Sequence, residues 1–371
     1  MKYYLIAGEA SGDLHGANLM RALREKDPDA QFRFWGGDMM ASVGGTPVRH
    51  IRDLAIMGFV EVVAHLSTVL GNISFCKRDI ESWHPDAVIG IDYPGFNLKI
   101  ETWAHERGFK TVHYISPNLW AWKKGRIKGM RKSLDLLCYI LPFEERFFAE
   151  NNMPQALYVG HPLLDAVKDH LFEPAFSGKR HVIALLPGSR RQELKSSLPL
   201  MVQLAERHPE YRFIVAGMSL IGKEFYDELI EKRLSNLEVV YDQTYPLLAS
   251  AYAAVVCSGT ATLETALFNV PQVVCYRANP VSIAIARLIV SKRIKYISLV
   301  NLIADKPIVT ELIQGDFNPT RLEQEFQLIT TNDAHRIRMF TQYAQMRTLI
   351  SGSGASARTA QAIIDIIPHN S

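Results

Sequence analysis

Residues 255–267 have the types and spacing of a site that could hold a phosphate group. Val255 to Cys257 predict the end of a buried strand, and the residues after the turn are good helix formers. The first amides of a helix lack partners within it, and the helix dipole is positive at that end, so such a turn suits a phosphate. The turn and the first helical position are formed by Ser258, Gly259, Thr260 and Ala261.

Glu264 lies about one turn into the same predicted helix. A carboxylate at that place could accept hydrogen bonds from the hydroxyl groups of a ribose. An ordinary βα junction with a serine cap accounts for the same residues, so this stretch by itself leaves both interpretations open.

A second loop between a strand and a helix follows the predicted strand 181–186. Gly188 permits close approach of the backbone to a ligand, Ser189 offers a hydroxyl, and Arg190 carries a rigid fork of donors that suits phosphate oxygens. Two such loops in one half of the chain favour phosphate binding more strongly than one.

Asp92 is the candidate general base. It ends the predicted strand 86–92, and Pro94 and Gly95 stop that strand just after it. The acid is therefore expected at the carboxyl end of the sheet, where α/β folds bind ligands. An acid there can act as a base if burial raises its pKa towards neutrality. A turn-forming Asp is the alternative interpretation.

The loop 8–13 precedes a helix predicted over residues 14–26. It lacks GxGxxG, which disfavours a nicotinamide cofactor. Glu9 and Asp13 would repel a phosphate and suit the hydroxyls of a sugar better. The interpretation of Ser11 and Asp13 as caps of the following helix is equally compatible.

Asn301 places an amide inside the apolar run 296–303. A buried amide without partners is costly, so its side chain must bond to the backbone or to a ligand. The backbone is the commoner partner of the two.

The run 56–73 predicts a helix with one fully apolar face, because its apolar residues follow i, i+3, i+4 spacing. Such a face packs on a sheet or, with the basic Lys77 and Arg78 nearby, lies on a membrane surface or an acyl chain. The residues of this face are Phe59, Val62, Val63, Leu66, Val69, Leu70 and Ile73.

Charge and composition limit the classes of function that this chain can have. The net charge of +3 is too small to argue for nucleic acid by itself. Trp120 and Trp122 accompany a basic segment, 123–132. This segment suits binding to nucleic acid, to a phosphorylated lipid or to an anionic membrane, or it forms a solvated helix face.

The four cysteines share no CxxC spacing, so we expect buried thiols in a reducing cytoplasm and no metal site. No run approaches the roughly 20 apolar residues that span a bilayer.

Alternating strands and helices joined by glycine-bearing loops predict a doubly wound α/β fold. At 371 residues the chain is too long for one ordinary core, which indicates two domains. We place an N-terminal domain over residues 1–170 and a C-terminal domain over residues 171–354, with the polar stretch 172–180 as the linker. A final helix within 355–371 is expected to pack back on the first domain.

A series of motifs goes beyond a generic α/β pattern. In chain order they are GEASGD (8–13), MGFVE (57–61), IDYPGFN (91–97), YISP (114–117), WAW (120–122), LPFE (141–144), VGH (159–161), LPGSR (186–190), SGTA (258–261) with Glu264, and LVNL (299–302). Together they closely resemble the lipid-A-disaccharide synthase family of bacterial glycosyltransferases, from residue 3 to about residue 315. One departure is Gly95, where family members often carry a second acid, and Asp92 remains the matching one.

The resemblance implies the GT-B architecture, in which two Rossmann-like domains face a cleft. Its reaction joins UDP-2,3-diacylglucosamine to 2,3-diacylglucosamine 1-phosphate (lipid X). It forms a β-1,6-linked disaccharide 1-phosphate with inversion and releases UDP, and no metal or other cofactor is expected.

The same resemblance assigns roles to residues of this chain. Asp92 would take the proton of the acceptor's 6-hydroxyl, the turn 258–261 and Arg190 would hold the diphosphate, and Glu264 would hold the ribose. The acylated substrates strengthen the membrane interpretation of the apolar helix. We therefore expect a cytoplasmic protein that is peripherally bound to the inner membrane.

Two alternatives stay open. One is another enzyme on the same two-domain plan, either a UDP-N-acetylglucosamine 2-epimerase or an undecaprenyl-linked N-acetylglucosaminyltransferase; an epimerase would need no acyl-binding surface. The other is a non-catalytic nucleotide-sugar-binding or membrane-scaffold protein, which would bind UDP without turnover. The acyl-chain length and the oligomeric state, including a homodimer, do not follow from the sequence.

Overall fold

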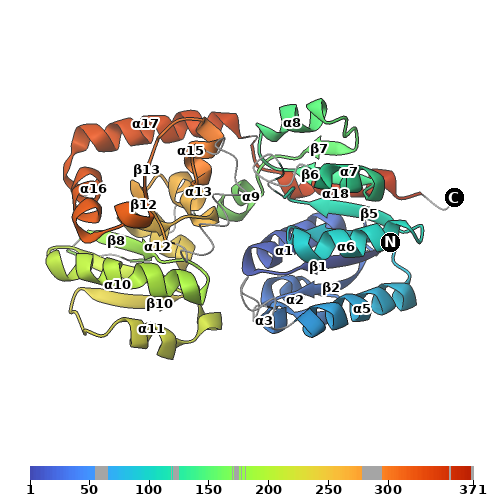
Figure 1. The fold of residues 1–371 in the computed structure, drawn as a ribbon, viewed down its shortest axis with the longest axis horizontal. Coiled ribbons are helices and arrows are strands. Elements are labelled where there is room, and N and C mark those ends of the chain that lie inside the picture. The colour runs from blue at the N-terminus through green and yellow to red at the C-terminus, as the bar shows by residue number, and fades with distance from the viewer. Residues whose placement is uncertain are drawn as a thin grey trace. The chain divides into compact units, whose positions relative to one another are not determined.

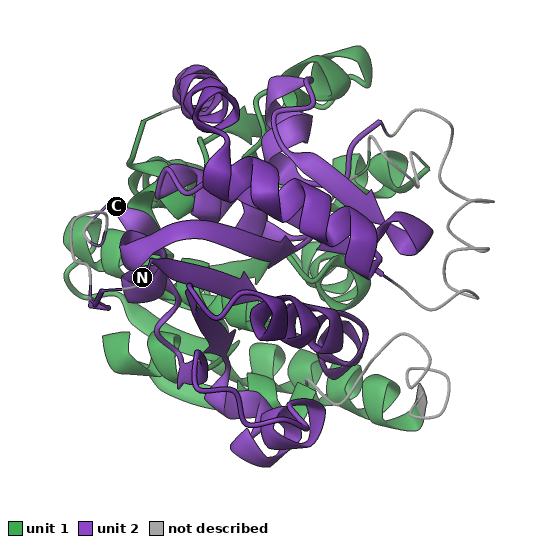
Figure 2. Cartoon of the chain, turned by 90° about the vertical axis from the view of Figure 1, so that its left-hand side faces the viewer, with its two compact units in different colours: residues 1–166, 351–371 green, residues 167–350 purple. Residues whose placement is uncertain are grey.

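The computed structural model divides into two compact units (Figure 2). Unit 1 comprises residues 1–166 and 351–371, and unit 2 comprises residues 167–350. The sequence places the boundary after residue 170, and the structure places it after residue 166. The residues that the structure describes are 1–54, 66–117, 119, 125–168, 170, 175–176, 178–179, 181–277, 295–350 and 352–368.

Unit 1 is built on a seven-stranded sheet whose paired strands run parallel. The strand order is β3-β2-β1-β4-β5-β6-β7. Figure 1 labels β1, β2, β5, β6 and β7 of this sheet. Central strands such as β4 are continuous apolar runs with every residue buried, as expected for a parallel sheet covered on both faces. The strands are β1 (Lys2–Ala7), β2 (Gln31–Gly36), β3 (Thr46–His50), β4 (Ala87–Ile91), β5 (Lys110–Tyr114), β6 (Leu136–Tyr139) and β7 (Ala156–Tyr158).

The helices of unit 1 connect these strands, except for α9, which follows the last strand, and α18, which returns from the C-terminal end of the chain. They are α1 (Ala10–Lys26), α2 (Asp38–Val43), α3 (Ile51–Leu54), α5 (Leu66–Trp83), α6 (Pro94–His105), α7 (Arg126–Ser133), α8 (Glu144–Glu150), α9 (Leu163–Val167, which reaches the unit boundary) and α18 (Ala355–Ile366). Helix α18 packs against α1. The Asp165 carboxylate accepts hydrogen bonds from the amides of Gly354 and Ser356, and Arg358 donates to the Val159 carbonyl oxygen at 2.7 Å. These contacts bind the C-terminal helix to unit 1.

Unit 2 contains a six-stranded sheet, again with parallel pairs, in the order β10-β9-β8-β11-β12-β13. Its strands are β8 (Val182–Leu186), β9 (Arg212–Gly217), β10 (Leu237–Tyr241), β11 (Ala251–Cys257), β12 (Gln272–Tyr276) and β13 (Thr310–Ile313). Its helices are α10 (Arg191–Arg207), α11 (Lys223–Leu229), α12 (Thr244–Ser250), α13 (Thr260–Leu267), α15 (Leu299–Ala304), α16 (Pro319–Thr331) and α17 (Asp333–Leu349), with short 3₁₀ turns η1 (Ser219–Ile221) and η2 (Gln314–Asp316).

In each sheet the strand order reverses at one point. β1 lies between β2 and β4, and β8 lies between β9 and β11. Doubly wound sheets bind ligands at the carboxyl ends of the strands at such switch points. The loops after β1 and β4, and those after β8 and β11, therefore mark where each unit offers a site.

One local prediction differs from the structure, and some short strands are not predicted at all. The sequence predicts a loop through Asp13, but α1 begins at Ala10, so Ser11 and Asp13 lie inside the helix. The edge strand β3 is not predicted, because its exposed residues and Pro47 resemble a loop. The strand β13 is also not predicted from its four residues, since so short a run carries little periodicity.

The predicted apolar helix is described only from Leu66 onward. Phe59, Val62 and Val63 lie outside the described residues, as does the side chain of Leu66. Val69 packs against a core cluster that includes Trp35 and Ile73, whereas the side chain of Leu70 is 53% exposed. The described part of this face thus divides between the core and the surface. Among the described residues no helix is long and apolar enough to cross a membrane.

Unit 1 contains two buried histidines, His15 on α1 and His161 after β7, and His15 acts electrostatically on His161. Burial lowers the pKa of His15 to about 4, against a smaller opposing effect of Asp165. Burial and, to a lesser extent, His15 lower the pKa of His161 to about 3. Both imidazoles are therefore neutral near pH 7.

Unit 1 should lose stability as the pH falls below about 6.5, the pKa of histidine in an unfolded chain. Because both folded-state pKa values lie lower, the unfolded chain binds these protons first. Each histidine then costs about 1.4 kcal/mol per pH unit until its folded pKa is reached. All five tryptophans lie in unit 1, so urea unfolding followed by tryptophan fluorescence measures this unit. In His161→Asn, the free energy of unfolding should fall less steeply with pH between pH 6.5 and 5. An unchanged slope would refute the conclusion that burial lowers the pKa of His161.

Candidate active site

Asp92 occupies a turn that departs sharply from its strand. β4 ends at Ile91, and Asp92 and Tyr93 then both adopt left-handed backbone conformations, with φ of 47° and 49°. Such values are uncommon outside glycine and persist only where the surrounding structure enforces them. The amide of Asp92 donates to the carbonyl oxygen of Tyr114 at 2.8 Å, so the turn stays attached to β5. Asp92 itself is half-buried at the carboxyl end of the sheet.

The buried side chain of Asn97, on the first turn of α6, enforces this conformation. Its Nδ2 donates to the carbonyl oxygens of Asp92 at 2.7 Å, Ile6 at 3.1 Å and Ile91 at 3.4 Å. One amide group therefore ties together the ends of β1 and β4, the two strands that form the switch point of unit 1.

The loop after β1 meets the Asp92 turn. A Cβ atom at Gly8 would lie 2.5 Å from Cγ of Tyr93, so only glycine lets the two loops approach this closely. Burial and then the charge of Glu9 raise the pKa of Tyr93, which shows that Glu9 lies near the same turn. The structure thus brings Glu9 and Asp92 to one edge of the sheet.

The sequence predicts that Asp13 binds a sugar hydroxyl or caps its own helix, but the structure gives its carboxylate other partners. Its buried carboxylate accepts hydrogen bonds from the amides of Gly37 at 2.7 Å and of Met39 and Met40 at 3.0 Å. It therefore binds the first turn of α2 rather than the start of its own helix, and its oxygens are engaged by backbone. Ser11 lies half-buried on α1.

In unit 2 the loops after β8 and β11 lie side by side, because these strands pair with Leu186 opposite Val256. Helix α13 begins at Thr260, directly after Gly259, whose φ of 151° is rare for residues with a side chain. No described side chain caps this helix. The amide of Thr262 donates to the Gly259 carbonyl oxygen at 3.2 Å, so the amides of Thr260 and Ala261 are the ones that an anionic ligand can satisfy. Ser258 donates to the Ile297 carbonyl oxygen at 3.2 Å, which holds the turn.

The loop after β8 is shaped by Glu193, for which the sequence predicts no role. Gly188 has a φ of 111°, and a Cβ there would lie 2.4 Å from Oε2 of Glu193. The same oxygen accepts from the amides of Ser189 at 2.9 Å and of Arg190 at 3.3 Å. The Arg190 side chain is 62% exposed, with Nη1 3.9 Å from Glu193 Oε1. The place of Glu193 in the first helical turn is the signal that could have identified it.

Glu264 is held by Tyr245 of α12, whose hydroxyl donates to Oε1 at 3.0 Å. Burial raises the pKa of Glu264 to about 6, and the hydrogen bond from Tyr245 opposes the rise. The group is therefore mainly a carboxylate at pH 7 and can accept a further hydrogen bond from a hydroxyl.

Asn301 is bound by the protein itself. Its Oδ1 accepts from the amide of Val309 at 3.0 Å, and its Nδ2 donates to the Val309 carbonyl oxygen and to Glu311 Oε1, both at 2.9 Å. Glu311 also accepts from the amide and the hydroxyl of Ser298, the cap of α15. The backbone, the commoner partner expected from the sequence, is thus the partner observed.

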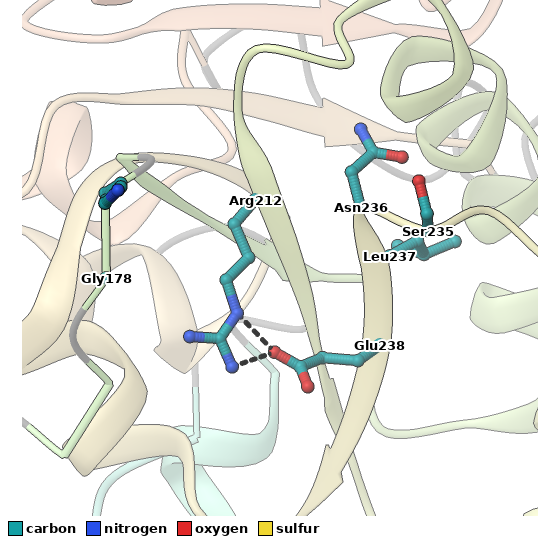
Figure 3. A pocket seen from close by; sticks show the side chains of 7 residues that line it. Gly178, Arg212, Ser235, Asn236, Leu237 and Glu238 are labelled. Carbon is teal, nitrogen blue, oxygen red and sulfur yellow. Dashed lines mark hydrogen bonds and ion pairs between the residues drawn. The ribbon is translucent and has the colours of Figure 1, made fainter.

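A cavity of about 260 Å³ in unit 2 lies at the other ends of the strands (Figure 3). Arg212 and Glu238, at the starts of β9 and β10, line it and form an ion pair in which Nε lies 2.7 Å from Oε1. These are the amino ends of parallel strands, so the cavity is separate from the loops after β8 and β11. In the described part of the chain, no group of three or more His, Cys, Asp or Glu side chains could hold a metal ion.

Two Rossmann-like units with these switch points define the GT-B class. The crystal structure of UDP-GlcNAc 2-epimerase from Neisseria meningitidis matches with a TM-score of 0.69 at 13% identity, covering 98% of this chain and 100% of that one. That of the glycotransferase of kitacinnamycin matches with a TM-score of 0.66 at 13% identity, covering 99% of each chain. At such identities the likeness shows the fold alone.

The family follows from the sequence comparisons. The model of the lipid-A-disaccharide synthetase family matches residues 3–365. The lipid-A-disaccharide synthase of Alcanivorax borkumensis is 37% identical, covering 98% of this chain and 97% of the relative. This chain belongs to the lipid-A-disaccharide synthetase family and is a glycosyltransferase. The epimerase alternative is not favoured by this membership.

Gly188→Ala should destabilise unit 2 by roughly 1–3 kcal/mol, because the new methyl group meets Glu193 and the backbone conformation is strained for alanine. Gly315→Ala is the matched control, since a Cβ there meets nothing within 4 Å. Differential scanning calorimetry should show a lower unfolding temperature for the first variant only. Equal unfolding temperatures would refute the packing described for this loop.

Proposed function

We propose that this chain transfers 2,3-diacylglucosamine from UDP to the 6-hydroxyl of 2,3-diacylglucosamine 1-phosphate (lipid X). The products are the β-1,6-linked disaccharide 1-phosphate and UDP. Family membership supports the reaction, and one structural observation carries the proposed mechanism. The family's matching acid, Asp92, stands at the switch point of unit 1 in a turn that the protein holds in a strained conformation.

Asp92 is proposed to act as the general base. It takes the proton from the acceptor's 6-hydroxyl as that oxygen attacks the anomeric carbon of the donor. The bond between this carbon and the diphosphate oxygen breaks on the opposite side, and its electron pair leaves with UDP. A single displacement of this kind inverts the configuration, which accounts for a β-linked product from an α-linked donor.

The UDP-binding role is proposed for unit 2. The diphosphate binds at the start of α13, and the exposed guanidinium of Arg190 compensates the charge that develops as UDP departs. Glu264, steadied by Tyr245, accepts hydrogen bonds from the ribose hydroxyls. With these groups in place we expect no requirement for a metal ion. Glu9 remains the candidate for a sugar hydroxyl in unit 1.

Asp92→Asn and Arg190→Ala should separate catalysis from donor binding. Asp92→Asn should lower turnover by roughly 100-fold or more and leave UDP affinity unchanged, because only the base is lost. Arg190→Ala should weaken UDP binding, measured by isothermal titration calorimetry. Arg212→Ala, at the opposite ends of the strands, is the control and should change neither quantity. Near-normal turnover of Asp92→Asn would exclude it as the base.

Peripheral attachment to the inner membrane is the second proposal. Both substrates carry acyl chains, and unit 1 exposes Leu70 on α5 together with the basic residues Lys128, Arg131 and Lys132 on α7. An exposed apolar residue and exposed cations both favour an anionic lipid surface. Trp120 and Trp122 of the same basic segment lie outside the described residues.

Leu70→Ser should reduce binding to liposomes that contain anionic lipid by about five-fold, the loss expected when one partly inserted leucine becomes polar. Ile337→Ser is the matched control, because Ile337 is 63% exposed but lies in unit 2. Co-sedimentation measures both variants. Equal losses in the two variants, or none in Leu70→Ser, would argue against this surface.

A further inference from the structure

A buried ion pair lies beside the Asp92 turn in unit 1. His113 on β5 and Glu101 on α6 are both fully buried, and Nδ1 of the imidazole lies 2.8 Å from Oε1 of the carboxylate. Among the described residues, Nε2 of His113 and Oε2 of Glu101 have no hydrogen-bond partner. An apolar pair of similar volume would cost less to bury, so stability alone gives a poor account of this one.

Strand β4 is adapted to admit the pair. Gly90 is the residue opposite His113 in the sheet, and a Cβ on Gly90 would lie 2.1 Å from Oε1 of Glu101. Glycine inside a strand weakens it and commonly marks the close approach of another group. Gly90 lies on β4 two residues before Asp92, and the same Cβ would lie 2.9 Å from Cβ of Asn97, whose Nδ2 donates to the Asp92 carbonyl oxygen at 2.7 Å. The Glu101–His113 contact therefore lies beside the side chain that fixes the Asp92 turn.

The electrostatics link the pair to Asp92. Burial lowers the pKa of His113, but Glu101 and then Asp92 raise it by more, so the net pKa lies above its usual value. Glu101 acts from α6 and Asp92 from the end of β4, while Glu9, after β1, acts on Tyr93. Because the interaction is mutual, an imidazolium that is favoured by Asp92 also favours the ionised form of Asp92.

We propose that the Glu101–His113 pair is a positioning element for the base: its imidazolium acts through space on the Asp92 carboxylate, while Asn97 fixes the backbone beneath it. This rests on the proposed function of Asp92 as the base. Glu101 holds His113 in place and favours its charged form. Neither residue is required to touch the substrate.

Two variants test the proposal through the pH dependence of turnover. His113→Gln removes the cation and leaves Glu101 unpaired, so the acid limb of the profile should move to higher pH by about one unit. Glu101→Gln removes one charge of each sign from the surroundings of Asp92, because His113 then becomes neutral. Its acid limb should move in the same direction but less. A purely structural pair would lower turnover or protein yield without moving the limb, and that result would overturn the proposal.

Titration of His113 by NMR of the full-length protein gives a readout that does not need turnover. The signal is assigned by its absence in His113→Gln. Asp92→Asn should lower the His113 titration midpoint, and Glu101→Gln should lower it further. An unchanged midpoint in Asp92→Asn would disprove the coupling even if Asp92 is the base. Retained turnover of Asp92→Asn together with a lowered midpoint would disprove the base and leave the coupling intact.

UDP affinity serves as the control for both variants. Donor binding is assigned to unit 2, so Glu101→Gln and His113→Gln should bind UDP with the affinity of the unaltered chain. A parallel loss of UDP affinity would show general damage to the protein and would count against a local role.

Discussion

The hydrogen bonds of the Asn97 side chain are the constraint on which the site in unit 1 depends. A strand that ends in two successive left-handed residues is unfavourable, and it is retained because one buried amide binds the carbonyl oxygens of Ile6, Ile91 and Asp92. Since those oxygens belong to β1 and β4, the same contact fixes the two strands between which the sheet reverses. The backbone that carries the Asp92 carboxylate is therefore held at the switch point by hydrogen bonds from Asn97 and to Tyr114.

Unit 2 uses the same topology for a different purpose. Among the described residues, its switch point has no acid in a left-handed conformation. It has a helix whose first turn no described side chain caps, and a neighbouring loop with an exposed arginine. Glu193 accepts hydrogen bonds from the amides of Ser189 and Arg190 in that neighbouring loop. The start of α13 is therefore the better candidate for a phosphate-binding site. On the proposed mechanism, one parallel-sheet plan thus gives a base in one unit and an anion site in the other.

Much of the fold, and the location of the candidate loops within it, could be predicted from the sequence. Strand ends and glycine turns are local, so the positions of Asp92, Gly188 and Gly259 and the two-unit organisation followed from short stretches. The partners of buried polar groups could not be predicted, because they join residues far apart in the chain. Asp13 binds the first turn of α2 and Tyr245 holds Glu264, and neither contact has a signal in sequence spacing.

The apolar helix shows the same limit. Its periodicity predicts one continuous face, yet the adjacent residues Val69 and Leu70 have different environments. Val69 packs against the core cluster, whereas Leu70 is exposed to solvent. Periodicity identifies an apolar stripe but does not say where the core ends. Only packing decides which of its residues remain exposed for a lipid surface.

The most direct test of the central claim is the stereochemistry and stoichiometry of the product. Purified protein would be incubated with UDP-2,3-diacylglucosamine and lipid X in the presence of EDTA, and the disaccharide analysed by NMR. We predict one UDP released for each disaccharide formed, with a β-1,6 linkage. An α-linked product, or UDP release without disaccharide, would contradict a single displacement assisted by Asp92.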